Sequence, residues 1–303
     1  TTTGFSKVKT LTATALLRSF AIRGLPKRGA PLQSLLSRYD ERLAQGFAGV
    51  LTPDVTHVVV SQSLLPALWM GGHLGGRTFD VLMTRPPMVE LEKELDRAHL
   101  LHPESWTLSD FRARSDLKRA EADALAEAGY LVTPHAEIAK RFGARAIRLD
   151  WRRPSSYTAV GFDQNRTAGR SVLFPESTLA RKGAYELREA ARALDLEIVL
   201  LGPVLEDPDF WGGVRVRQAG DNWLKGIDVV CLPSFVASSP RRLLNAVAQG
   251  VPVITTPACG LGYAEGVTTV MPGDAEALIG EIERVLEPGS GVLKSKILRL
   301  AKS

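Results

Sequence analysis

From about residue 170 onward, short apolar runs alternate with amphipathic stretches of helical length. Runs rich in Val, Ile and Leu are typical of strands buried inside a parallel sheet, and the helical stretches supply the crossovers that such strands need. The runs are Ser171–Phe174, Leu196–Leu201, Val214–Val216, Asp228–Leu232, Pro252–Thr255 and Val267–Val270, and the helical stretches are Lys182–Leu194, Arg241–Gln249 and Asp274–Leu286. The alternation predicts βαβ units building a parallel sheet of about six strands.

The first half of the chain shows the same alternation less regularly. Helix-like stretches cover Leu32–Ala48 and Asp116–Ala128, and strand-like runs cover His57–Val60, Phe79–Met83 and Tyr130–Thr133. Residues 151–170 have no apolar period and contain Pro and Gly, so they are the best candidate for a linker. We therefore expect two α/β lobes, residues 1–150 and 171–287, with a terminal segment at 288–303.

Composition narrows the class of protein. Of the 303 residues 45% are hydrophobic, as in soluble globular proteins, and charged residues interrupt every apolar stretch before the ~20 residues that cross a bilayer. Cys231 and Cys259 both close apolar runs, which indicates small buried residues in a reducing, cytoplasmic compartment rather than a disulfide framework. The chain starts with Thr1 and has no apolar signal core, so we expect an incomplete amino-terminal lobe.

The net charge of +5 is spread along the chain in short groups. A solvated basic surface is the favoured interpretation, and attraction to an anionic membrane or an anionic ligand stays open as an alternative. Basic and aromatic residues do not interleave as they do on nucleic-acid platforms, so no nucleic-acid partner is expected.

Polar and basic residues follow three of the expected strands, where open parallel sheets bind ligands. Arg181 and Lys182 stand near a helix start, where cations oppose the helix dipole unless an anion lies between them. A phosphate would supply that anion, and the competing interpretation is a pair of hydrated surface cations. The second turn has Ser238 or Ser239 before Pro240, which indicates a helix cap more than a ligand contact. The third turn has small residues around Gly260 that would let a ligand approach the backbone.

Together these segments resemble a large family of retaining glycosyltransferases, the group 1 or family 4 type. That family includes sucrose synthases, glycogen synthases and mannosyltransferases of lipopolysaccharide assembly. Its matching residues here are Phe174, Lys182-Gly183, Leu187, Ala190, Pro233-Ser234, Pro240, Leu244, Ala246, Ala248, Gly250–Ile254, Gly260, Pro272–Asp274 and Ala277-Leu278, with weaker landmarks at Asp54–His57 and Ala128–Gly143. The resemblance implies the GT-B fold, in which two Rossmann-like lobes share one active site.

The resemblance also implies a function. The carboxy-terminal lobe would bind a nucleotide-diphosphate sugar, and the amino-terminal lobe would bind the acceptor, a glycan or a lipid-linked sugar. A hexosyl-type sugar would pass to an acceptor hydroxyl with retention of configuration, in glycan biosynthesis at the cytoplasmic side, with peripheral association with the inner face of the membrane as one option. No cofactor and no metal are expected, because no Asp-x-Asp pair closes a strand.

The donor motif of the family is altered in this chain. The family holds the diphosphate with an Arg and a Lys five residues apart, and it holds the sugar and ribose with two Glu eight residues apart. Ser177 stands in the place of the Arg, Ala237 and Asn245 stand in the places of the two Glu, and Lys182 alone is retained. We expect Asn245 to face the ribose through its amide and Arg241 or Arg242 to replace the missing charge. A non-catalytic GT-B module, acting as a binding or assembly subunit, is the alternative function.

Other polar residues give weaker signals. Arg85 occupies the approximate place of a family His on the acceptor side, and His73 lies in a glycine-rich stretch that could approach substrate, although an ordinary loop histidine is favoured. His135 is interpreted as a surface or capping residue, Lys182 as solvent-facing and Glu206-Asp207 as loop charges. No Gly-x-Gly-x-x-Gly follows a strand, which argues against a nicotinamide dehydrogenase.

Overall fold

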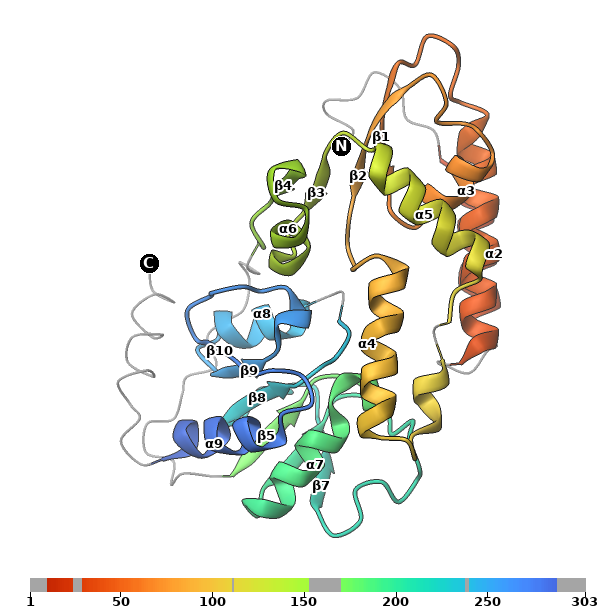
Figure 1. Ribbon diagram of the computed structural model, residues 1–303. Helices are drawn as coiled ribbons and strands as arrows, with labels where there is room; N and C mark the ends of the chain where they lie inside the picture. Colours follow the sequence, from red (N-terminus) through yellow and green to blue (C-terminus); the bar gives the residue numbers. More distant parts are fainter. Residues whose placement is uncertain (1–9, 24–28, 111, 153–169, 238–239, 288–303) are drawn as a thin grey trace. The chain divides into compact units, whose positions relative to one another are not determined.

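The computed structural model describes residues 10–23, 29–110, 112–152, 170–237 and 240–287 (Figure 1). By its internal contacts the chain divides into two units. The first contains residues 1–83, 87–89 and 110–132, and the second contains residues 84–86, 90–109 and 133–303. Most of the expected linker, residues 153–169, and the whole of 288–303 lie outside the described residues, so those two boundaries stay predictions.

The second unit is built on a six-stranded sheet whose five strand pairings are all parallel. Its strands are β5 (Ser171–Phe174), β6 (Glu197–Leu200), β7 (Arg215–Gln218), β8 (Val229–Leu232), β9 (Val253–Thr255) and β10 (Val267–Thr269). The spatial order is β10-β9-β8-β5-β6-β7, so the chain builds outward from β5 in one direction and from β8 in the other. This order places a topological switch point between β5 and β8, and it confirms the predicted parallel α/β architecture.

Three α-helices cover this sheet: α7 (Ala184–Ala193), α8 (Arg241–Ala248) and α9 (Ala275–Leu286). α7 and α9 pack on each other on one face, and α8 lies on the other (Figure 1). α8 buries Leu243, Leu244 and Val247 at helical spacing, and it ends before Gly250, whose φ of 76° a residue with a side chain rarely adopts. Each helix lies within two residues of its predicted bounds at both ends.

The first unit carries α1 (Thr12–Arg23), α2 (Ala30–Ala48), α3 (Leu65–Met70) and α5 (Ser115–Glu127), which pack in sequence on one another as α1 on α2, α2 on α3 and α3 on α5. The second sheet has the order β1-β2-β3-β4, with β1 (His57–Ser61), β2 (Thr78–Leu82), β3 (Leu131–Thr133) and β4 (Ala146–Arg148). The β1–β2 and β2–β3 pairings are parallel, which confirms a second α/β arrangement before residue 150.

Two stretches that precede residue 153 belong to the second unit. The first contains most of α4 (Met88–Leu101) and the 3-10 turn η1 (Trp106–Ser109), and the second contains α6 (Ala136–Phe142), the 3-10 turn η2 (Gly143–Arg145) and β4. Two further 3-10 turns, η3 (Ala180–Lys182) and η4 (Pro257–Cys259), follow β5 and β9. Contacts of η1 with η3 and of α6 with η4 therefore border the carboxyl edge of this sheet with residues from both halves of the sequence.

Candidate functional site

Lys182 joins the two loops that flank the switch point. It ends η3 after strand β5, and its Nζ donates a hydrogen bond of 3.0 Å to the carbonyl oxygen of Val236, in the loop after β8. Gly183 follows with a φ of 79°, and a Cβ there would lie 2.2 Å from the Pro233 oxygen. Lys182 is thus not the solvent-facing residue that the sequence indicated, because its ammonium group is turned inward to the neighbouring loop.

Three cations, Arg181, Lys182 and Arg242, lie close together around this loop. Burial lowers the pKa of Lys182, and the charges of Arg181 and Arg242 lower it further, while Glu176 raises it. Glu176 offsets part of this positive charge at the carboxyl end of β5. Each added cation costs energy in a partly buried site unless an anion compensates it.

Arg242 reaches the turn that carries Ser177. Its guanidinium donates to the carbonyl oxygen of Pro175 and lies 3.6 Å from a carboxylate oxygen of Glu176, the residue before Ser177. Arg241, its neighbour on α8, is exposed and makes no hydrogen bond or ion pair within the described part of the chain. Of the two arginines expected to replace the missing charge, Arg242 therefore has the geometry for it.

Asn245 lies on α8 and is 7% exposed. Its Oδ1 is buried and accepts no hydrogen bond from any residue that the structure describes. A buried acceptor without a donor costs about 1–3 kcal/mol, so a ligand hydroxyl that reached it would recover that energy. Ala237, which stands where the family has its first Glu, is buried and offers no polar atom.

Gly260 does not leave an open space for a ligand. Its φ is 70°, and a Cβ on it would lie 2.3 Å from the imidazole ring of His135. Its carbonyl oxygen accepts hydrogen bonds from the backbone of Ala136 at 2.9 Å and from the indole of Trp151 at 3.1 Å. The absence of a side chain at Gly260 therefore lets His135 pack against its backbone. Ser238 and Ser239, the other small polar residues expected near the donor, lie outside the described residues.

His135 caps α6, as the sequence indicated, but it is buried rather than on the surface. Its Nδ1 accepts the N–H of Ile138 at 3.4 Å, and its Nε2 lies 3.0 Å from the carbonyl oxygen of Ala258. This pair of contacts fixes the neutral tautomer with hydrogen on Nε2. Burial lowers the pKa of His135, which agrees with that neutral state.

Glu206 is a buried carboxylate rather than a loop charge. It accepts hydrogen bonds from Ser105 Oγ at 3.0 Å, from Thr107 Oγ1 and from the Ala180 N–H at 2.7 Å. It thereby ties η1 to η3, directly before Lys182. Asp207 does behave as a loop charge, since it is exposed and its carboxylate accepts the nearby N–H of Asp209.

His102 is a second polar residue that sequence reasoning missed. Its Nε2 lies 2.7 Å from the Glu186 carboxylate, which is 2% exposed, and its ring stacks on Tyr185 with centroids 4.4 Å apart. The ring of Phe235, in the loop after β8, meets it edge-on. His102 and Glu186 are 84 residues apart, so no local pattern could have paired them.

The two residues expected on the acceptor side lie in different units. Arg85 belongs to the second unit and donates to the carbonyl oxygen of Pro86 at 3.0 Å. His73 belongs to the first unit, and its ring packs against the backbone of Gly71 between α3 and β2. These contacts neither support nor contradict a role of Arg85 or His73 in acceptor binding, which stays a prediction.

A family model matches the part of the chain that carries the switch point. The match covers residues 179–288, and the family is described as glycosyl transferases group 1. The segment that follows β5 is therefore similar in sequence to group 1 glycosyl transferases. Among curated proteins, none matches the chain by sequence.

Solved glycosyltransferase structures share the fold of the whole chain. A sucrose-phosphate synthase from Thermosynechococcus elongatus aligns with a TM-score of 0.60 at 16% identity, over 90% of this chain and 77% of its own. The lipopolysaccharide outer core galactosyltransferase WaaB aligns with a TM-score of 0.52 at 13% identity, over 86% and 76%, and TarM with 0.54 at 9%, over 86% and 54%. At such identities the likeness establishes the GT-B fold and leaves the substrates open.

Membrane-spanning helices and metal-binding clusters are both absent from the residues that the structure describes. Within the described ranges, no helix is long and apolar enough to span a bilayer. The same residues contain no group of three His, Cys, Asp or Glu side chains placed to hold a metal ion.

Proposed function

We propose that this group 1 glycosyltransferase moves a sugar from a nucleotide-diphosphate sugar to a hydroxyl of a glycan or a lipid-linked sugar, with retention of configuration. It would work in the cytoplasm, with the inner face of the membrane as the place for a lipid-linked acceptor. No cofactor would be needed, because the cations at the switch point would carry the charge of the leaving diphosphate.

The observation that carries this proposal is the reach of Arg242 from α8 to the turn after β5. Ser177, on that turn, stands where the family has an Arg, so Arg242 returns a guanidinium to the same neighbourhood from a different helix. With Lys182 beside it, the pair would bind the diphosphate, and the unpartnered Oδ1 of Asn245 would accept a ribose hydroxyl.

A non-catalytic binding subunit is the second candidate, and Ala237 is the observation that favours it. The family places a Glu against the donor sugar there, whereas this buried methyl group can make no hydrogen bond. A module that binds a nucleotide without transferring sugar would lack this contact while keeping Lys182.

The first experiment titrates the full chain with UDP, GDP and ADP by calorimetry, comparing wild type, Arg242→Gln and Arg241→Gln. Losing one charge-assisted contact costs about ten- to a hundredfold in affinity. We expect that loss for Arg242→Gln and wild-type affinity for Arg241→Gln, which removes the same charge one residue away. Lys182→Met serves as a further variant, with thermal unfolding as a check because its ammonium also holds Val236.

The second experiment separates the two candidates. Transfer from the sugar form of the preferred nucleotide is measured with and without EDTA, and NMR of the product gives its anomeric configuration. Activity that EDTA abolishes would refute the metal-free proposal, and an inverted product would refute retention. Nucleotide binding without transfer to any acceptor would favour the binding subunit, and equal affinity of wild type and Arg242→Gln would remove Arg242 from the site.

A further inference from the structure

The first unit contains a polar cavity far along the sequence from the switch-point residues. Its volume is about 160 Å³, and it lies between α2 and the start of α5. The side chains that line it are Gln33, Ser34, Ser37, Arg38, Arg112, Arg114 and Leu117, together with Ala113. Three guanidinium groups, two hydroxyls and an amide thus surround one small space that contains no acidic side chain.

The helix α2 presents its polar face to this cavity. The pair Ser37 and Arg38 lies one turn after the pair Gln33 and Ser34, so the 3.6-residue period places all four on one side of the helix. Their side chains make no hydrogen bond and no ion pair with any residue in the described ranges. The hydrogen-bond donors of these four side chains are therefore available to a ligand.

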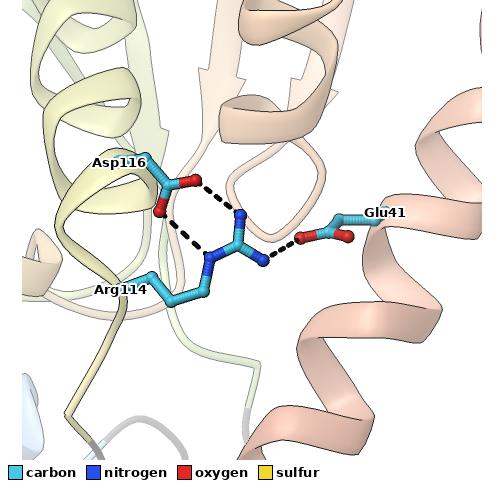
Figure 2. A network of polar contacts seen from close by, with 3 residues as sticks. All are labelled: Glu41, Arg114 and Asp116. Carbon is cyan, nitrogen blue, oxygen red and sulfur yellow. Dashed lines mark hydrogen bonds and ion pairs between the residues drawn. The ribbon is translucent and has the colours of Figure 1, made fainter.

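Arg114 is held in place at the opposite wall. Figure 2 shows its guanidinium between two acids: it donates to both carboxylate oxygens of Asp116 and, at 3.1 Å, to Glu41 on α2. The hydrogen bonds from Arg114 lower the pKa of Asp116, and the two carboxylates together offset the charge of Arg114. Arg38 has no such partner among the described residues, and its guanidinium lines the cavity.

We propose that this cavity binds a phosphate group. Guanidinium forks and hydroxyl donors match the several acceptor oxygens of a phosphate, and the start of α5 adds the positive end of its helix dipole. A sugar phosphate and the lipid phosphatidic acid both present a phosphate monoester. Phosphate binding in this cavity does not depend on the proposed function. That the phosphate-bearing molecule is the acceptor of the sugar rests on the proposed function.

The test is an NMR titration of the full chain at low ionic strength, following the backbone amides of Ser34, Ser37 and Arg114. The probes are inorganic phosphate, glucose 6-phosphate and phosphatidylcholine vesicles with or without phosphatidic acid, the vesicles being followed by sedimentation. Because these arginines are solvent-exposed and screened by salt, Arg38→Gln should weaken binding about threefold or more. Arg38→Lys keeps the charge but not the bidentate guanidinium, so its affinity should lie between those of wild type and Arg38→Gln. Arg119→Gln, which removes an exposed arginine of α5 outside the cavity, should bind like wild type.

Saturable binding of glucose 6-phosphate or of the phosphatidic acid vesicles, weakened in Arg38→Gln but not in Arg119→Gln, supports the site and identifies the carrier. Equal affinity of wild type, Arg38→Gln and Arg119→Gln overturns it, as does the absence of saturable shifts with every probe. Nucleotide binding at the switch point is measured separately, so that failure here leaves the proposed function untouched.

Discussion

Replacing Glu206 by Ala should destabilise the second unit strongly, although the residue lies in a loop. The substitution removes the acceptor from three donors at once: the hydroxyls of Ser105 and Thr107 and the N–H of Ala180. The hydroxyls can rotate toward other acceptors, but the Ala180 N–H is fixed by the backbone and would stay buried without a partner.

The expected cost follows from these three bonds. An unpaired buried N–H costs about 1–3 kcal/mol, and each lost hydrogen bond to a charged group about 1.5–3 kcal/mol before the carboxylate's own desolvation is subtracted. We estimate a net loss of about 2–4 kcal/mol in the free energy of unfolding. That is a large share of the ~5–15 kcal/mol that stabilises an ordinary domain.

Urea unfolding followed by tryptophan fluorescence measures this loss. Four of the five tryptophans, Trp106, Trp151, Trp211 and Trp223, belong to the second unit, so the signal reports mainly on that unit. The matched control is Asp207→Ala, which removes the same charge from the next residue and should cost less than about 0.5 kcal/mol. Equal unfolding midpoints for the two variants would refute the role of Glu206 as a buried acceptor.

Two further predictions concern the same edge of the sheet. Gly183→Ala should lower the free energy of unfolding by about 3 kcal/mol or more, because a Cβ would meet the Pro233 oxygen at 2.2 Å and the φ is 79°. The control Gly280→Ala, in α9 with open space around it, should instead be neutral or stabilising. Similar melting temperatures for the two variants would contradict this account. The lowered pKa of His135 means that its stabilising contribution is complete above the unfolded-state value of ~6.5 and is lost as the pH falls through the folded value. Melting temperatures measured from pH 8 to 5 should therefore fall more steeply for wild type than for His135→Asn, and parallel curves would argue against a neutral buried ring.

Local pattern predicted the carboxy-terminal fold well. β5 and β8 were predictable because short runs of apolar residues are typical of buried parallel strands, and α9 because its apolar residues recur at helical spacing. β7 was displaced by two residues at its end because it is an exposed edge strand, whose register is set by pairing with β6 rather than by burial. α4 was missed because it buries only Leu95 and Ala98, which leaves a weak apolar period.

The candidate site was predictable in part. The sequence placed Lys182 at the switch point, but it could not say that its Nζ turns toward Val236, or that Arg242 rather than Arg241 reaches the turn of Ser177. Those outcomes depend on side-chain directions set by packing between loops. Glu206 was misinterpreted for a similar reason, since two of its donors, Ser105 and Thr107, are 101 and 99 residues away in sequence.

The second unit is discontinuous in sequence, and this limits how it can be produced and how it can fold. A fragment cut at the expected linker would lack Ser105 and Thr107 for Glu206, and it would lack His135 against Gly260. It would also lack Arg97, whose guanidinium donates to the Pro272 oxygen at 2.7 Å. During synthesis, residues 90–109 must wait for the strands of the carboxy-terminal sheet before they find their partners, so the second unit matures only after that sheet has been made.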